Sequence, residues 1–212
     1  MNIIRLEKKI LQRNEEIAEI NRLLFHEKGI SVHNLIGSPG TGKTRILERI
    51  IEKIQNKRKI GVIEGDCQTD RDAQRINKYN IPVVQVITDG GCHLIAAQIQ
   101  QALEKLPLND IDLLFIENVG NLVCPTNFDL GEYRKWVIIS TAEGDDKPLK
   151  YPGIFTAAEI MVINKIDLIP YVECDIETLR YNALSVNPKL TIFSVSGKTG
   201  EGIDKLCDSL TQ

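Results

Sequence analysis

The sequence predicts a doubly wound α/β fold, in which helices flank a mostly parallel sheet and one further helix precedes it. Two observations carry this prediction. Short apolar runs alternate with stretches of helical periodicity, as they do when parallel strands are joined by right-handed crossovers. Polar segments rich in Gly, Asp and Asn follow several of these runs, as expected at the end of a parallel sheet where ligands bind. The 212 residues suffice for one large domain with a substantial core, and we assign residues 1–212 to it.

The composition is ordinary for a globular protein, with 42% hydrophobic and 26% charged residues and a formal net charge of −3. No basic stripe is visible, so we expect no nucleic-acid partner. No apolar run approaches the ~20 residues of a membrane span, and the first residues lack the apolar core of a signal peptide, so we expect no membrane partner. Five cysteines without framework spacing indicate reduced thiols and a cytoplasmic location.

The chain opens with an amphipathic stretch at residues 3–25, where Ile and Leu recur at helical spacing and charged residues fill the other faces. We interpret residues 1–28 as a helix packed on the main sheet, with a detachable partner-binding arm as the alternative. The apolar runs that we expect to form strands are 32–36, 60–63, 83–87, 111–116, 136–140, 160–163 and 190–195. The helices expected after the first are 45–54, a short helix ending at Tyr79, 94–106, 176–186 and a last helix after residue 200.

The segment between the first predicted strand and the helix 45–54 reads G-x-x-x-x-G-K-T, the pattern of the phosphate-binding loop of P-loop nucleoside triphosphatases. Its residues, all predicted to bind nucleotide, are Gly37, Ser38, Pro39, Gly40, Thr41, Gly42, Lys43 and Thr44. Glycines let the backbone approach phosphate closely, and the N–H groups of the helix start then point at it. We expect Lys43 to reach the β- and γ-phosphates and the Thr44 hydroxyl to bind Mg²⁺.

Two acidic residues stand where predicted strands end near this loop. Glu117 occupies the position of a Walker-B acid, and Asp66 ends the strand that begins at Ile60. Together with Thr44 they form the predicted magnesium site, and with Lys43 they form the predicted catalytic set. For Asp66 a plain turn residue remains the alternative, and a solvated helix start explains Asp70 and Asp72 equally well.

A second nucleotide motif follows the run 160–163. The segment Asn164-Lys165-Ile166-Asp167 has the N-K-x-D pattern of guanine-specific proteins. Guanine presents an N1–H and an amino group side by side, and the single carboxylate of Asp167 can accept from both, whereas adenine offers no such pair. We expect Lys165 to lie along the ring and Asn164 to tie this loop to the phosphate-binding loop. The next strand leads to the predicted base-contacting loop, Ser196-Gly197-Lys198. The expected nucleotides are therefore GTP and GDP.

Cys92, His93 and Cys124 form a third constellation, whose thiolate and imidazole groups suit Ni²⁺ or Zn²⁺. We expect Cys92 to stand at a helix N-terminus, which lowers the pKa of a thiol. Spacing alone leaves a metal site and plain core packing equally open. Because three protein ligands rarely complete a site, a dimer that doubles the set is attractive. The other three cysteines, interpreted as structural, are Cys67, Cys174 and Cys207.

Taken together, these motifs resemble those of the HypB family of hydrogenase nickel-incorporation GTPases. The matching segments are GSPGTGKT (37–44), EGDxxTDRDAQRI (64–76), GCHL (91–94), FIENVGNLVCP (115–125), FDLGE (128–132), EGDDKPLKYP (143–152) and NKIDLIPY (164–171). The resemblance implies a SIMIBI-class GTPase of low turnover that dimerises with nucleotide and helps to load nickel into [NiFe]-hydrogenase. It also implies that Cys92, His93 and Cys124 bind the metal at the dimer face. The implied partners are a nickel-insertion protein and the hydrogenase large subunit.

The sequence departs from some members of that family, because no Cys precedes Cys67 and His26 and His33 are isolated. We therefore expect the GTPase-domain metal site without a Cys-rich or His-rich nickel-storage motif. There are three alternatives: a urease-accessory GTPase, whose Cys-Pro-His motif is absent, a metal-binding dimer in which nucleotide is structural, and a P-loop small-molecule kinase. In the polar loop 143–152, Lys147 and Lys150 are expected to contact nucleotide or a partner chain, unless the loop is simply solvated.

Overall fold

A seven-stranded sheet forms the centre of the computed structural model, which describes residues 6–211. The strand order is β3-β2-β4-β1-β5-β6-β7, and every neighbouring pair is parallel. The strands are β1 (Ser31–Ile36), β2 (Ile60–Asp66), β3 (Val83–Ile87), β4 (Leu113–Glu117), β5 (Arg134–Ser140), β6 (Ile160–Asn164) and β7 (Thr191–Ser194). The chain runs outward from β1 in both directions, so the doubly wound parallel sheet predicted from the sequence is confirmed.

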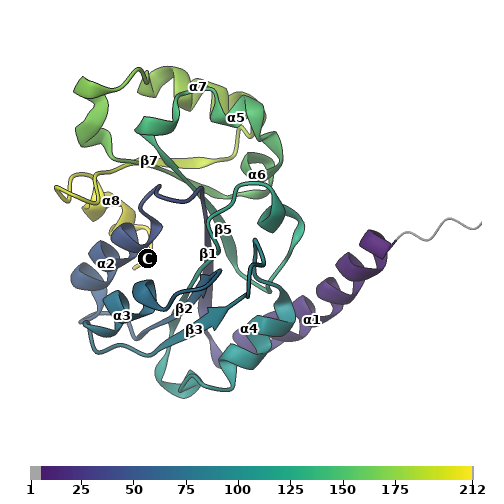
Figure 1. Ribbon diagram of the computed structural model, residues 1–212. Helices are drawn as coiled ribbons and strands as arrows, with labels where there is room; N and C mark the ends of the chain where they lie inside the picture. Colours follow the sequence, from purple (N-terminus) through teal and green to yellow (C-terminus); the bar gives the residue numbers. More distant parts are fainter. Residues whose placement is uncertain (1–5, 212) are drawn as a thin grey trace, which may run out of the picture.

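Helices cover both faces of this sheet (Figure 1). They are α1 (Leu6–Lys28), α2 (Lys43–Ile54), α3 (Arg71–Asn77), α4 (Ala96–Leu103), α5 (Lys147–Lys150), α6 (Pro152–Ala157), α7 (Ile176–Val186) and α8 (Ile203–Asp208), with 3₁₀ segments η1 (Leu108–Asp110), η2 (Cys124–Asn127), η3 (Thr141–Glu143) and η4 (Ile166–Tyr171). One face packs against α2, α3 and α8. The opposite face packs against α1 and α4 at one end and against α6 and α7 at the other.

The two-residue repeat of a β-strand explains why both faces are apolar. In β4, Leu113 and Phe115 face the core under α2, whereas Leu114 and Ile116 face the core under α4. α2 buries Ile and Leu at helical spacing, and its first two residues, Lys43 and Thr44, are the last two of the phosphate-binding loop. The sheet therefore carries every loop that follows a strand to one edge, where the predicted site residues meet.

The N-terminal helix α1 is docked by polar contacts as well as by apolar packing. Asn14 Nδ2 donates to the Asp129 carbonyl oxygen at 2.7 Å, and the Asn21 amide donates to Ala96 O at 3.0 Å. Phe25 completes the core under α4. The purple N-terminal part of α1 projects from the body in Figure 1. The packed-helix interpretation thus fits the C-terminal half of α1, while residues 1–5 of the predicted helix 1–28 lie outside the described residues.

Several predicted boundaries were wrong by one to three residues. The apolar run 60–63 is extended in β2 to Asp66, because residues 64–66 pair with β3 and Glu64 also pairs with β4. The helix predicted at 94–106 is α4, which begins only at Ala96, where the Gln98 side chain caps the backbone of Ile95. The predicted loop 143–152 contains the short helix α5. Among residues 6–211, no helix combines the length and the apolar character needed to cross a membrane.

Candidate nucleotide and metal site

The phosphate-binding loop forms the floor of a pocket of about 430 Å³ at the edge where β1, β2 and β4 end. Lys43 is buried, and its Nζ donates to Gly37 O at 3.2 Å. Gly42 has φ of 92°, and a Cβ there would lie 2.5 Å from Asn164 Nδ2. Only glycine fits this position, which is the physical reason for the motif's last glycine. The pocket's further lining residues are Pro39, Gly40, Thr44, Arg45, Gly65, Asp66, Cys67, Asp72, Arg75, Glu117, Asn118, Val119 and Gly120.

Thr44 and Glu117 lie together beneath this pocket. The Thr44 hydroxyl donates to Glu117 Oε1 at 2.8 Å, and Glu117 is 5% exposed. Its second oxygen, Oε2, is buried without a hydrogen-bond partner among the described residues. A hydroxyl and an unsatisfied carboxylate oxygen are ligands of the kind that Mg²⁺ takes beside substrate phosphates. The two residues therefore fit the magnesium ion predicted here.

Glu64, which the sequence did not single out, is a buried acid next to the site. It stands directly opposite Glu117 in the β2–β4 pairing, and only 1% of it is exposed. Burial, followed by the charges of Glu117 and Asp72, raises the pKa of Glu64 well above its ordinary value. Burial also raises the pKa of Glu117, and the charge of Lys43 and the hydrogen bond from Thr44 oppose this shift without cancelling it. The signal was an acid inside a strand, which becomes visible only once the strand register is known.

Asp66 is both a turn residue and a residue of the pocket, the two interpretations that the sequence left open. Its Oδ1 accepts hydrogen bonds from the backbone N–H groups of Gln68 at 2.8 Å and Thr69 at 2.7 Å, as a turn residue does. It also lines the pocket. Burial opposes its ionisation, but these backbone donors lower the pKa of Asp66. Asp72 lines the pocket as well, whereas Asp70 accepts from the side chain of Gln74.

The N-K-x-D segment lies beside the phosphate-binding loop. Asn164 Nδ2 donates to Thr41 O at 2.7 Å, and Asn164 Oδ1 accepts from the backbone N–H of Gly197 at 3.0 Å. The expected tie between the two loops is thus present. The hydroxyl of Ser196 donates to Asp167 Oδ1 at 2.5 Å. Lys165 adopts φ of 62° and its Nζ donates to Gly40 O at 2.7 Å, which carries its side chain across the phosphate-binding loop.

Cys92, His93 and Cys124 come together although thirty residues separate the first two from the third. One ligand atom from each lies within 4.8 Å of the others, and the His93 ring packs on Phe128 at a centroid distance of 3.9 Å. Two thiols and an imidazole fit a borderline-soft divalent ion. The pKa expectation for Cys92 was wrong: α4 starts four residues later, and the hydrogen bond with Cys124, together with burial, raises the pKa of the Cys92 thiol.

Comparison with known proteins shows which family shares these motifs and this fold. The model of the CobW/HypB/UreG nucleotide-binding domain matches residues 31–194. The chain belongs to the HypB family. It is 48% identical over 201 residues to the hydrogenase maturation factor HypB of Azotobacter vinelandii, covering 95% of this chain and 66% of that protein. The chain thus spans about two thirds of the length of that relative.

Two solved HypB structures share the fold. The crystal structure of the Archaeoglobus fulgidus hydrogenase maturation factor HypB superposes with a TM-score of 0.88 at 41% identity, covering 94% of this chain and 97% of that one. The Helicobacter pylori HypB structure, a complex with nickel, gives 0.89 at 35% identity, with 93% of each chain covered.

Two asparagines, also missed in the sequence analysis, join the HypB-type nucleotide pocket to the Cys-His cluster. Asn118 follows Glu117, and its Oδ1 accepts from the backbone N–H of Leu94 at 3.0 Å. Asn121 donates its own N–H to Gly37 O at 3.0 Å, while its Oδ1 accepts from the N–H of Cys124 at 3.2 Å. One residue therefore connects the phosphate-binding loop to a cluster ligand. The sequence signal was that both lie in the segment 115–125, which begins in β4 and resembles the HypB family.

Lys147 and Lys150 contact acids of their own chain. Lys147 Nζ lies 3.7 Å from Glu143 Oε1 and over the ring of Tyr151. Lys150 Nζ lies 2.5 Å from Asp146 Oδ2, and more than half of the Lys150 side chain is exposed. A contact of either lysine with nucleotide or with a second chain stays a prediction.

Proposed function

We propose that this chain is a Mg²⁺-dependent GTPase that couples GTP hydrolysis to nickel binding and delivery during maturation of [NiFe]-hydrogenase. The observation that carries the proposal is that one short segment connects the two sites. β4 ends in Glu117 at the phosphate pocket, and the chain reaches Cys124 of the Cys-His cluster seven residues later. A rearrangement around the γ-phosphate therefore displaces a metal ligand. The names of the relatives, hydrogenase maturation factors, and the nickel complex of one of them agree with this proposal.

Phosphate binding uses groups that are already in place. The N–H groups of the loop and the positive end of α2 attract the β-phosphate. Lys43, now bonded to Gly37 O, turns its ammonium group to the β- and γ-phosphates. Thr44 and Glu117 would hold the Mg²⁺ ion, which would neutralise phosphate charge. Asp66 contributes a second acid at the rim of the same pocket.

Base selection follows from hydrogen-bond matching. Asp167 already accepts from Ser196 through Oδ1 and keeps further acceptor positions for the two adjacent donors of guanine. Adenine would leave this carboxylate desolvated and unpaired. Lys165 lies over the phosphate-binding loop, where its methylene groups can flank the base.

The metal is cargo in this proposal. Cys92, His93 and Cys124 supply two sulfur ligands and one nitrogen ligand from one chain. A second chain doubles the set, so a nucleotide-dependent homodimer completes the site, with square-planar Ni²⁺ or tetrahedral Zn²⁺ as occupants. A nickel-insertion protein and the hydrogenase large subunit are the proposed partners in delivery.

Phosphate release from GTP and ATP with Mg²⁺ tests the nucleotide half of the proposal. Lys43→Ala should abolish turnover, because it removes the ammonium group that binds the phosphates. Lys57→Ala, at an exposed position after α2, is the matched control and should behave as wild type. Equal turnover of ATP and GTP, or activity in Lys43→Ala, would contradict the assignment.

Nickel binding tests the other half. Cys92→Ala should lose Ni²⁺ affinity, whereas Cys174→Ala, in the core under α7, should keep it. A metal-binding dimer with structural nucleotide would bind nickel but show no GTP turnover, so the two assays together separate these functions.

A further inference from the structure

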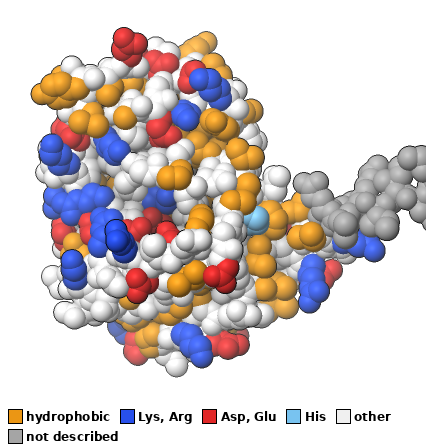
Figure 2. Space-filling view, viewed as in Figure 1, with side chains coloured by type: hydrophobic (Ala, Val, Ile, Leu, Met, Phe, Trp, Pro, Cys, Tyr) orange, Lys and Arg blue, Asp and Glu red, His pale blue; other side chains and the backbone are white. Residues whose placement is uncertain are grey.

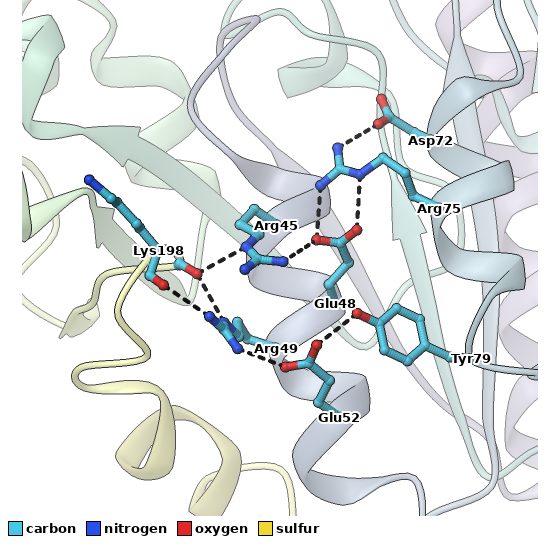
Figure 3. Close-up of polar contacts among 9 residues, drawn as sticks. Arg45, Glu48, Arg49, Glu52, Asp72, Arg75, Tyr79 and Lys198 are labelled. Atoms are coloured by element: carbon cyan, nitrogen blue, oxygen red, sulfur yellow. Dashed lines mark hydrogen bonds and ion pairs between the residues drawn. The ribbon is translucent and has the colours of Figure 1, made fainter.

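Charged side chains gather over α2 and α3 on the face shown in Figure 2. They form two chains of contacts that run across α2 to the loop 196–198, one from α3 and the other from Tyr79 in the turn after α3 (Figure 3). On α2, Arg45 and Glu48 belong to one chain, and Arg49 and Glu52, one turn further along, belong to the other. We call the contacts through Glu48 the inner relay and those through Glu52 the outer relay.

The inner relay joins Asp72 to the backbone of the base-contacting loop. Arg75 donates to both oxygens of Glu48, from Nε and from Nη2, at 2.9 Å each, and its Nη1 donates to Asp72 Oδ1 at 2.9 Å. Arg45 Nη1 donates to Glu48 Oε2 at 2.9 Å, and Arg45 Nε donates to Gly197 O at 3.1 Å. Three side chains thus bridge two segments that are more than a hundred residues apart in the sequence.

The carboxylate at the centre of this relay is held firmly. The Glu48 side chain is 9% exposed. Burial disfavours its charge, but the guanidinium groups of Arg75 and Arg45 lower the pKa of Glu48. A planar guanidinium bound through two nitrogens fixes direction as well as distance. The position of Arg75, and with it that of Asp72, is therefore set by Glu48.

The inner relay reaches the nucleotide pocket, because Arg45, Asp72 and Arg75 line it. The outer relay has the same arrangement of contacts but lies outside the nucleotide pocket. Tyr79 donates to Glu52 at 2.8 Å, and Arg49 joins Glu52 to the carbonyl oxygens of Gly197 and Lys198. None of Tyr79, Glu52 and Arg49 is among the pocket-lining residues, so the outer relay serves as an internal control.

We propose that Glu48 and Arg75 are positioning residues of the nucleotide site, which hold Asp72 at the phosphate pocket and tie it, through Arg45, to the loop that contacts the guanine base. The inference rests on the proposed GTPase function and adds residues to it. Neither residue touches the reacting atoms; each acts through the placement of Asp72. Since a displacement of about 1 Å at a reacting centre lowers turnover by up to about 100-fold, loss of the relay should lower kcat far more than it raises KM.

Steady-state GTP hydrolysis by wild type, Glu48→Gln and Glu52→Gln tests the proposal. Gln keeps the shape of Glu but presents an NH₂ group to a guanidinium donor, which breaks the paired contact. We expect Glu48→Gln to lower kcat by about 10- to 100-fold with KM within about threefold, and Glu52→Gln to match wild type. Equal kcat in the two variants would overturn the proposal. Absence of turnover in wild type would instead refute the proposed function.

A second variant and a second measurement cover the case in which Glu48→Gln folds poorly or turnover is absent. Arg75→Lys keeps the positive charge but loses the fork, and it should show the same fall in kcat. Amide hydrogen exchange should accelerate over residues 66–77 in both variants, while the strands keep wild-type protection. Acceleration spread evenly over the sheet would show a merely structural role, and no acceleration over residues 66–77 would show that the relay does not hold this segment. Either result would refute the proposal.

Discussion

Replacement of Asp167 by Asn isolates the base-recognition chemistry with the least disturbance to the fold. Asp167 Oδ1 accepts from the Ser196 hydroxyl at 2.5 Å, so the Asn carbonyl oxygen can keep this bond and turn its NH₂ group toward the base. Two charged hydrogen bonds to guanine are then lost, and each contributes about 1.5–3 kcal/mol. The sum, about 3–6 kcal/mol, corresponds to a loss of about 10²- to 10⁴-fold in GDP affinity.

The assay is titration of GDP, XDP and ADP into wild type, Asp167→Asn and Asp204→Asn. Xanthine carries a carbonyl oxygen where guanine carries its amino group, so the Asn NH₂ should improve XDP binding. Asp204, largely exposed on α8 and paired with Lys53, is the matched control and should leave all three affinities unchanged. Wild-type GDP affinity in folded Asp167→Asn would refute the assignment of the guanine site.

Three further predictions concern other groups. Glu64 has a raised pKa in the folded chain, so stability falls as pH rises above about 4.5, and Glu64→Gln should flatten this slope in denaturant titrations at pH 5 and 8. Burial lowers the pKa of His33 to about 3, so unfolding takes up a proton below pH 6.5, and wild type should lose up to about 1.4 kcal/mol per pH unit more than His33→Gln between pH 6 and 4. Lys147→Ala and Lys150→Ala should reduce the dimer fraction with a GTP analogue in gel filtration; unchanged dimer in both would defeat that contact.

Most of the fold and of the nucleotide site could be predicted from local sequence patterns. The motif around Lys43 and the N-K-x-D segment each encode their own loop geometry, and Asn164 joins them as expected. Glu64 could not be found in this way, because its role depends on the pairing of β2 with β4. The expected effect of a helix on Cys92 failed because α4 begins at Ala96, two residues after the predicted start and four residues after Cys92. The relay through Glu48 likewise needs the packing of α3 on α2, which helical periodicity does not reveal.

The central claim is that nucleotide and metal binding are linked, and isothermal titration of Ni²⁺ tests it most directly. Titrations into the apo, GDP and GTP-analogue forms should give different affinities, with the tightest binding in the GTP-analogue form. Couplings of about 1–3 kcal/mol correspond to about 5- to 150-fold, and the GTP analogue must gain the same factor from nickel. Asn121→Ala, which removes the side-chain link to Cys124, should weaken this coupling while Cys92→Ala removes the binding itself. Equal Ni²⁺ affinity in all three nucleotide states would contradict the mechanism.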